Sequence, residues 1–301
     1  MPSRRLLLAR WLSRTFQRPM LARAQDHLWQ RARVEIGGRV FLRGRAPLVF
    51  RSDRLGGVPV RRRRGARQGT LFYIHGGAFM FFSARSHQGI AARLAMPLGL
   101  EPVLPDYRRA PEHPFPAAID DVTAAYRALV AEPDARPIVV AGESAGGGLA
   151  LSLLHRILAQ DLPRPAAVLA FSPWADLTLA GASLTANAET DAMLPARRLP
   201  DVAAAYLAGA DPAQPDASPV FGRFRGAPPV LIQAARDEIL FSDAETLSRR
   251  LAEQQVAVRL DAFPQGLHAF QLVHGWVPEA TAAVDAAVAF AGAALGRRVR
   301  G

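Results

Sequence analysis

A serine between two glycines, placed where a predicted strand meets a predicted helix, constrains the fold of this chain more than any other feature. Residues 142–146 read Gly-Glu-Ser-Ala-Gly, follow the apolar run 137–141 and open a helical pattern at Ala145. Glycines at both flanks let strand and helix approach closely, and the strained turn between them holds the Ser144 hydroxyl clear of the backbone. In this context the pattern is typical of a nucleophile elbow. We therefore expect Ser144 to be a nucleophile at the end of a buried strand.

The rest of the chain has the alternation of elements that such a turn requires. From residue 71 onward, short apolar or β-branched runs alternate with longer segments of helical periodicity, which indicates a mostly parallel sheet covered by helices. The predicted strands are residues 71–74, 101–105, 137–142, 166–171, 229–234 and 256–262. The predicted helices are residues 86–95, 117–131, 145–160, 243–254 and 278–295. Ser242 and Glu245 have the spacing of a capping box that would start the helix at residue 243.

Two regions do not follow this alternation. Residues 5–31 place apolar side chains at positions 8, 12, 16 and 28 among arginines, which predicts an amphipathic helix outside the sheet. Residues 181–226 are rich in Ala, Pro and Asp and are expected to form a lid over the site. We therefore divide the chain into an N-terminal cap segment (1–55), a core (56–180 and 227–301) and a second cap insertion (181–226).

Composition excludes several classes of enzyme. The chain has no cysteine, so a disulfide, a cysteine nucleophile and a thiolate metal site are ruled out. All 37 basic residues are arginine. The lack of lysine excludes a Schiff-base enzyme, a lysine-dependent phosphate loop and an S-x-x-K nucleophile system.

Positive charge is concentrated near the N-terminus. Residues 1–70 hold 18 arginines against Asp26, Glu35 and Asp53, so this segment carries +15 and the remainder −4, for a formal total of +11. Such a stretch suits an anionic membrane surface or nucleic acid, but a plain solvated face is the favoured interpretation. The apolar run 6–9 is too short for a signal peptide, and no segment offers the ~20 apolar residues of a membrane span. We expect a cytoplasmic protein, with peripheral membrane contact left open.

A serine nucleophile needs a base and an acid. In folds that carry a nucleophile elbow, the acid and then the base follow the serine along the chain. Among the three histidines after Ser144, His268 lies in a turn after the last predicted strand, where the base belongs. His155 falls within the helix that leaves the elbow, and His274 lies near the start of the last helix. Asp237 follows the strand 229–234 and is the expected acid, which would orient the imidazole. Two nearby carboxylates, Glu238 and Asp243, compete for that role.

A glycine-rich turn follows the first predicted strand of the alternation. Residues 75–79 read His-Gly-Gly-Ala-Phe and directly follow residues 71–74. Backbone N–H groups of such a turn, joined by that of Ala145, can stabilise an oxyanion. An ordinary turn after a strand is the alternative interpretation. The turn and the elbow support each other, because acyl transfer needs both a nucleophile and fixed donors.

The chain resembles the bacterial hormone-sensitive-lipase family of carboxylesterases over about residues 55–295. The resemblance rests on residues 75–79, 106–118 and 142–147, on the Ser-Pro-Trp-Ala-Asp-Leu segment at 172–177, and on the acid and base loops. It implies an α/β-hydrolase fold with an eight-stranded sheet and a helical cap, and it assigns the oxyanion donors to the N–H groups of Gly77, Ala78 and Ala145. Where the family usually has glycine this chain has Ala78, from which we expect altered selectivity before lost activity.

The function expected from these features is hydrolysis of short- to medium-chain carboxylic esters through an acyl-enzyme, with no metal or cofactor. The alternatives are another acyl hydrolase (peptidase, lactonase or amidase) on the same triad, or a small-ligand-binding module of the same fold. We expect a small-molecule ester as the partner, no nucleic acid, and a monomer or homodimer. The apolar residues offered for a substrate pocket are Phe79, Phe81, Trp174 and Met193.

Overall fold

The computed structural model describes residues 1–301 except 24–30, 33, 39–48, 66–67, 134–135 and 298–301. Its centre is a sheet of eight strands in the order β1-β2-β4-β3-β5-β6-β7-β8. Strand β2 pairs antiparallel with both β1 and β4, and all the other pairs are parallel. The strands are β1 (Arg51–Leu55), β2 (Val58–Arg62), β3 (Thr70–Ile74), β4 (Glu101–Pro105), β5 (Ile138–Glu143), β6 (Ala167–Phe171), β7 (Val230–Ala235) and β8 (Val258–Phe263).

The six predicted strands are confirmed as β3 to β8, each within two residues of its expected ends. The central strands are buried throughout, which explains why they read as continuous apolar runs. Strands β1 and β2 were not predicted from the pattern, because their arginines interrupt any apolar run: β1 is the outermost strand and is mostly exposed, and β2, next to it, carries Arg61 and Arg62. The sheet consequently begins at Arg51, ahead of residue 56, where we expected the core to start.

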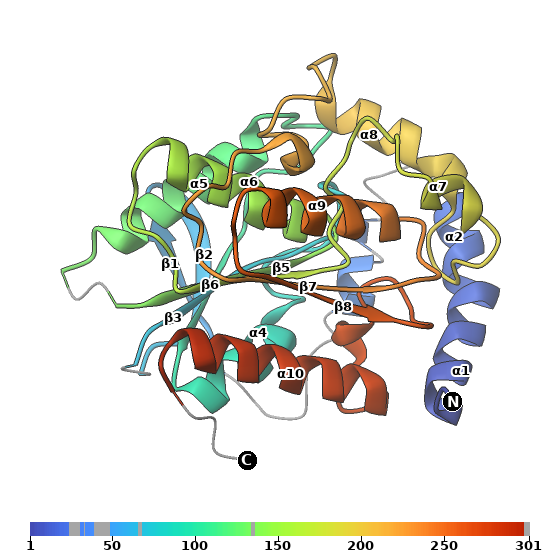
Figure 1. Ribbon diagram of the computed structural model, residues 1–301, viewed down its shortest axis with the longest axis horizontal. Helices are drawn as coiled ribbons and strands as arrows, with labels where there is room; N and C mark the ends of the chain where they lie inside the picture. Colours follow the sequence, from blue (N-terminus) through green and yellow to red (C-terminus); the bar gives the residue numbers. More distant parts are fainter. Residues whose placement is uncertain (24–30, 33, 39–48, 66–67, 134–135, 298–301) are drawn as a thin grey trace.

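Helices cover both faces of the sheet (Figure 1). One face packs against α4 (Gln88–Ala95) and α10 (Pro278–Ala294), and the other against α5 (Ala117–Val130), α6 (Ala145–Ala159) and α9 (Phe241–Glu253). The five predicted helices are therefore confirmed. Successive residues of a strand point to opposite faces, so each strand contributes to both apolar cores.

The start of α9 differs from the prediction. The helix begins at Phe241, and its N-cap residue Leu240 makes no side-chain hydrogen bond, so the Ser242 and Glu245 capping box is wrong. Ser242 instead exchanges hydrogen bonds with Ser183 of the second insertion: the Ser183 N–H donates to Ser242 Oγ at 2.8 Å, and the Ser242 N–H donates to Ser183 Oγ at 2.9 Å. These bonds attach the insertion to the core.

Helices of the N-terminal segment and of the insertion lie together at one end of the sheet (Figure 1). The first group is α1 (Arg4–Leu12), a π-helical stretch (Ser13–Gln17) and α2 (Arg18–Ala22); the second is α7 (Ser183–Ala186) and α8 (Leu199–Leu207). Arg14 and Arg18 donate to the backbone carbonyls of Glu189 and Ala188. The expected helix is thus observed up to residue 22, whereas Leu28 lies outside the described residues. No helix in the described ranges is long and apolar enough to cross a membrane.

Candidate active site

Ser144 lies on a sharp turn between β5 and α6. Its backbone has φ of 56° and ψ of −126°, a conformation that a non-glycine residue adopts only when the surrounding structure enforces it. The neighbouring glycines make the turn feasible: a Cβ at Gly142 would lie 2.3 Å from the Gly146 carbonyl oxygen, and a Cβ at Gly146 would lie 2.2 Å from that of Ile74. The turn therefore presents the Ser144 hydroxyl at the end of β5, as the sequence predicts.

His268 faces the Ser144 hydroxyl. The distance from His268 Nε2 to Ser144 Oγ is 2.7 Å, which is a hydrogen bond between the expected base and nucleophile. The loop that carries His268 follows β8 and is anchored by a hydrogen bond of 3.1 Å from the Ala269 N–H to Ser172 Oγ. The imidazole is buried, so few waters compete for its nitrogens.

Glu238, and not Asp237, contacts the other nitrogen of His268. Glu238 Oε2 lies 2.8 Å from His268 Nδ1. Its second oxygen accepts hydrogen bonds from the Ala235 N–H at 2.7 Å and from Ser172 Oγ at 2.9 Å, which hold the carboxylate in place. The expectation that Asp237 orients the imidazole is therefore corrected, and Glu238, one of the alternatives, occupies that position.

Asp237 instead connects the acid loop to the base loop and to the N-terminal helix. Its Oδ1 accepts a hydrogen bond of 3.0 Å from the Gly266 N–H, and its Oδ2 forms an ion pair with Arg10 of α1. The same guanidinium donates to the Gly266 carbonyl. Asp243, the remaining alternative, accepts hydrogen bonds from the backbone of residues 175 and 176 and lies outside the Ser144–His268–Glu238 chain of hydrogen bonds.

The charge on Glu238 changes the proton affinity of His268. Burial raises the pKa of the Glu238 carboxyl, and the hydrogen bond from His268 opposes that rise. Although burial alone would lower the pKa of His268, the hydrogen bond and the charge of Glu238 raise it above the ordinary value of 6.5. A raised pKa makes His268 a stronger proton acceptor, which suits it to act as a general base toward the Ser144 hydroxyl.

The raised pKa predicts how activity depends on pH. His268 can accept a proton only in its neutral form, so kcat/KM should fall as pH decreases through a midpoint above 6.5. Removing the negative charge by Glu238→Gln should move this midpoint to lower pH. Hydrolysis rates of p-nitrophenyl acetate, measured across the pH range and extrapolated to zero buffer concentration, test both statements. A wild-type midpoint below 6.5 would contradict the first, and an unmoved midpoint in the variant would contradict the second.

The glycine-rich turn after β3 has the backbone conformation of a donor loop. Gly77, Ala78 and Phe79 all have positive φ, at 105°, 55° and 60°. Gly76 lies beside the nucleophile, because a Cβ at that position would be 3.1 Å from the Ser144 Cβ. Among the described residues, the N–H groups of Gly77, Ala78 and Ala145 donate to no protein acceptor. These are the three donors that the resemblance implies for an oxyanion, and Ala78 supplies an N–H despite its methyl group.

A buried carboxylate that sequence reasoning did not single out supports this turn. Glu143, next to the nucleophile, accepts hydrogen bonds from the Gly76 N–H and from the Tyr73 hydroxyl at 2.6 Å, and lies 3.0 Å from His87 Nε2. Although burial would raise the pKa of Glu143, the charge of His87 and these hydrogen bonds lower it. Glu143 occupies the first unspecified (x) position of the Gly-x-Ser-x-Gly pattern, so only the packing identifies its partners.

Loss of the Glu143 charge should disturb the donor turn. Glu143→Gln directs an amide donor toward groups that already donate, so we expect kcat to fall roughly 10- to 100-fold while KM changes little. Tyr73→Phe removes only one of the partners and should cost roughly threefold or less. Steady-state kinetics on p-nitrophenyl acetate, with thermal unfolding as a check on folding, compare the two. Equal kcat in Glu143→Gln and wild type would refute the positioning role.

The residues offered for a substrate pocket have different environments. Phe79 and Trp174 are buried in the core, where the Phe79 ring stacks on Tyr206 with centroids 3.7 Å apart. Phe81 is partly buried against the same core, and Met193 is partly exposed. Their role in substrate binding stays a prediction.

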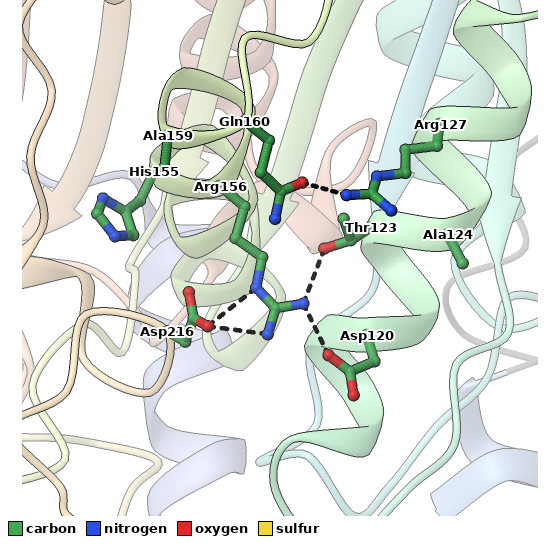
Figure 2. Close-up of a pocket in the computed structure, with 9 residues that line it drawn as sticks. All are labelled: Asp120, Thr123, Ala124, Arg127, His155, Arg156, Ala159, Gln160 and Asp216. Atoms are coloured by element: carbon green, nitrogen blue, oxygen red, sulfur yellow. Dashed lines mark hydrogen bonds and ion pairs between the residues drawn. The ribbon is translucent and has the colours of Figure 1, made fainter.

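Other polar groups lie away from Ser144. His155 of α6 accepts a hydrogen bond of 3.1 Å from the Arg223 N–H, and His274 Nδ1 lies 3.1 Å from the Gln271 carbonyl oxygen. A surface pocket of about 540 Å³ lies between α5 and α6 and is shown in Figure 2. Its central guanidinium, Arg156, is paired with Asp120 and Asp216, so its charge is already compensated. Within the described ranges, no cluster of three or more potential metal ligands is present.

Comparisons with known proteins agree with this fold and site. A sequence model of the alpha/beta hydrolase fold matches residues 71–272. An acetyl-hydrolase of Streptomyces hygroscopicus is 39% identical over 79% of this chain and 80% of its own length, and an esterase of Acinetobacter venetianus is 34% identical over 80% and 81%. The crystal structure of an esterase from the bacterial hormone-sensitive lipase family superposes with a TM-score of 0.87 at 31% identity, covering 98% of this chain and all of that one.

Fold and site together define an α/β hydrolase, an enzyme class built on a mostly parallel sheet with its nucleophile at the end of a central strand. Within that class, the chain belongs to the bacterial hormone-sensitive lipase family and is a carboxylic ester hydrolase.

Proposed function

We propose that the protein is a serine carboxylesterase whose triad is Ser144, His268 and Glu238. One observation carries the proposal: an unbroken chain of hydrogen bonds from Ser144 Oγ through both nitrogens of His268 to Glu238 Oε2, at 2.7 and 2.8 Å. Such a chain can move the hydroxyl proton to the imidazole while the carboxylate stabilises the charge that forms.

The reaction proceeds in two halves. In the first, Ser144 Oγ attacks the ester carbonyl carbon as His268 Nε2 takes its proton, and the carbonyl oxygen becomes an oxyanion. The N–H groups of Gly77, Ala78 and Ala145 donate to that oxyanion. His268 then protonates the leaving alcohol, and the acyl group stays on Ser144. In the second half, His268 Nε2 takes a proton from water as the water oxygen attacks the acyl carbon. The bond from that carbon to Ser144 Oγ then breaks, His268 returns the proton to Ser144 Oγ, and the acid is released.

The proposed substrates are carboxylic esters with short- to medium-chain acyl groups. The relative from Streptomyces hygroscopicus is named an acetyl-hydrolase, which supports small acyl groups. The packing next to the elbow points the same way: Trp174 donates its backbone N–H to the Ser144 carbonyl at 3.0 Å, and its ring lies 5.7 Å from that of buried Phe79. Bulky buried rings carried on residues beside the elbow turn would leave less room for a long chain.

Hydrolysis of a p-nitrophenyl ester series from acetate to palmitate tests the proposal. We expect wild-type activity to be highest on the short chains and Ser144→Ala to abolish it on all of them. Mass spectrometry after brief exposure to p-nitrophenyl butyrate near neutral pH, stopped by acid, should detect an added butyryl mass on Ser144. Activity that survives Ser144→Ala would overturn the proposed mechanism. Activity that is highest on palmitate would overturn the proposed preference for short chains.

A further inference from the structure

The first helix of the chain has two apolar faces, of which only one is covered. Leu6 and Ala9 of α1 are buried and pack with residues of the base loop and of α10, among them Leu267 and Phe270. The start of the helix is held by Ser3, whose Oγ caps the Leu6 N–H at 3.1 Å. Ser3 also bonds to Glu279 of α10. The helix is therefore fixed with its opposite face directed outward.

That outward face is apolar. Seven of the eleven large hydrophobic side chains that are exposed in the described part of the chain fall within residues 1–20. Trp11 is 57% exposed and Phe16 is 61% exposed, with their ring centroids 6.2 Å apart. Water-exposed apolar groups concentrated in one short segment are unfavourable unless a partner covers them. We call this surface the N-terminal face; its apolar members are Leu7, Leu8, Trp11, Leu12, Phe16 and Met20.

Arginines accompany these side chains in the sequence, and no acidic residue lies among them. Residues 1–23 contain six arginines and neither Asp nor Glu. Arg10 is paired with Asp237, and Arg18 lies 4.0 Å from the exposed Glu189 carboxylate. Arg14 hydrogen-bonds to a neutral backbone carbonyl and forms no ion pair within the described part of the chain. The N-terminal face therefore combines large apolar side chains with a net positive charge.

We propose that the N-terminal face docks on an anionic phospholipid surface. Trp, Phe and Leu side chains of a surface helix enter the boundary between headgroups and acyl chains, while arginines pair with the anionic headgroups. A second copy of this chain fits less well, because a two-fold contact would place this arginine-rich face against itself. The positive charge of the N-terminal face therefore favours an anionic lipid surface over a second copy of the chain as its partner.

Docking in this way would bring the lipid surface close to the catalytic base. Besides its ion pair with Asp237, Arg10 donates to the Gly266 carbonyl, two residues before His268 in the same loop. The side of α1 opposite the N-terminal face thus contacts the loop that carries the base. This inference does not depend on the proposed ester chemistry, and binding alone tests it.

Vesicle flotation of the full chain is the direct experiment. Vesicles of phosphatidylcholine alone are compared with vesicles of equal parts phosphatidylcholine and phosphatidylglycerol. We expect binding to the mixed vesicles at least about tenfold tighter than to phosphatidylcholine, and weakening as salt rises to roughly 0.5 M. Equal partitioning into both kinds of vesicle, or none into either, would overturn the proposal.

Matched variants separate the apolar and charged contributions. Trp11→Ser with Phe16→Ser, and Arg4→Gln with Arg23→Gln, should each weaken binding to the mixed vesicles by roughly tenfold or more. Met96→Ser and Arg225→Gln, which change exposed side chains elsewhere, should leave it within about twofold of wild type. Unchanged melting temperatures verify folding. Light scattering tests whether a second copy of the chain covers the N-terminal face instead. If the wild type is a dimer that does not bind vesicles, and if the Trp11 and Phe16 substitutions dissociate that dimer, the face is a subunit interface.

Discussion

Glu238→Gln should lower kcat roughly 10²- to 10⁴-fold, whereas Asp237→Asn should lower it by less than about tenfold. The difference follows from contact: Glu238 Oε2 lies 2.8 Å from His268 Nδ1, while Asp237 contacts Gly266 and Arg10. A glutamine at 238 can present its amide nitrogen to the imidazole, which favours the tautomer that cannot accept the Ser144 proton. Steady-state kinetics on p-nitrophenyl acetate measure both variants.

Glu238→Asp serves as the matched control for this comparison. It keeps the charge and shortens the side chain by one methylene, so we expect it to retain more activity than Glu238→Gln. Asp237→Asn keeps an acceptor for the Gly266 N–H and loses only the charge toward Arg10, which explains the smaller effect. If Asp237→Asn were the more damaging substitution, Asp237 would be the acid and the assignment of Glu238 would be wrong.

Gly146→Ala should destabilise the protein by about 3 kcal/mol or more. The new Cβ would lie 2.2 Å from the Ile74 carbonyl oxygen and 2.5 Å from that of His75, and both are backbone atoms that cannot move aside cheaply. Because these carbonyls lie where β3 meets the donor turn, any shift that relieves the clash displaces the turn. We expect the melting temperature to fall by roughly 6 °C or more and esterase activity to fall with it.

Gly37→Ala provides the comparison for that substitution. Gly37 is helical, and a Cβ there would meet no atom within 4 Å, so alanine should be neutral or slightly stabilising. Thermal unfolding followed by circular dichroism at one scan rate compares wild type with both variants. Melting temperatures for Gly146→Ala and Gly37→Ala that agree with wild type would show that the elbow tolerates a side chain, contrary to its geometry.

The predictable part of the fold was its buried part. Strands β3 to β8 and the five helices that cover the sheet leave clear periodic patterns, because buried strands are continuously apolar and covering helices are apolar on one side. Strands β1 and β2 escaped prediction because β1, the outermost strand, is mostly exposed, and because β2 buries an arginine whose charge is paired. Arg62 illustrates this: it is buried in β2, where its charge is compensated by Glu101 and Glu132.

The candidate site was predictable to different degrees for its three members. Ser144 lies in a pattern with a steric reason for each glycine, and His268 occupies the loop after the last strand. Asp237 and Glu238 are adjacent, and both follow the correct strand. Adjacent side chains in a turn point in different directions, so the choice between them depends on backbone conformation, which residue types do not encode locally.

The sequence by itself determined the class of the fold, and it predicted Ser144 and His268 as the candidate nucleophile and base and the loop after β7 as the source of the acid. These predictions depend on local patterns. Their physical causes are periodic burial and the steric need for glycine, and both can be recognised in a short stretch of sequence. The tertiary structure alone decided that Glu238 faces His268, that Glu143 supports the donor turn, and that Arg10 joins the N-terminal helix to the base loop. Each of these contacts joins residues 30 to 256 positions apart, and only packing brings such side chains within hydrogen-bond distance.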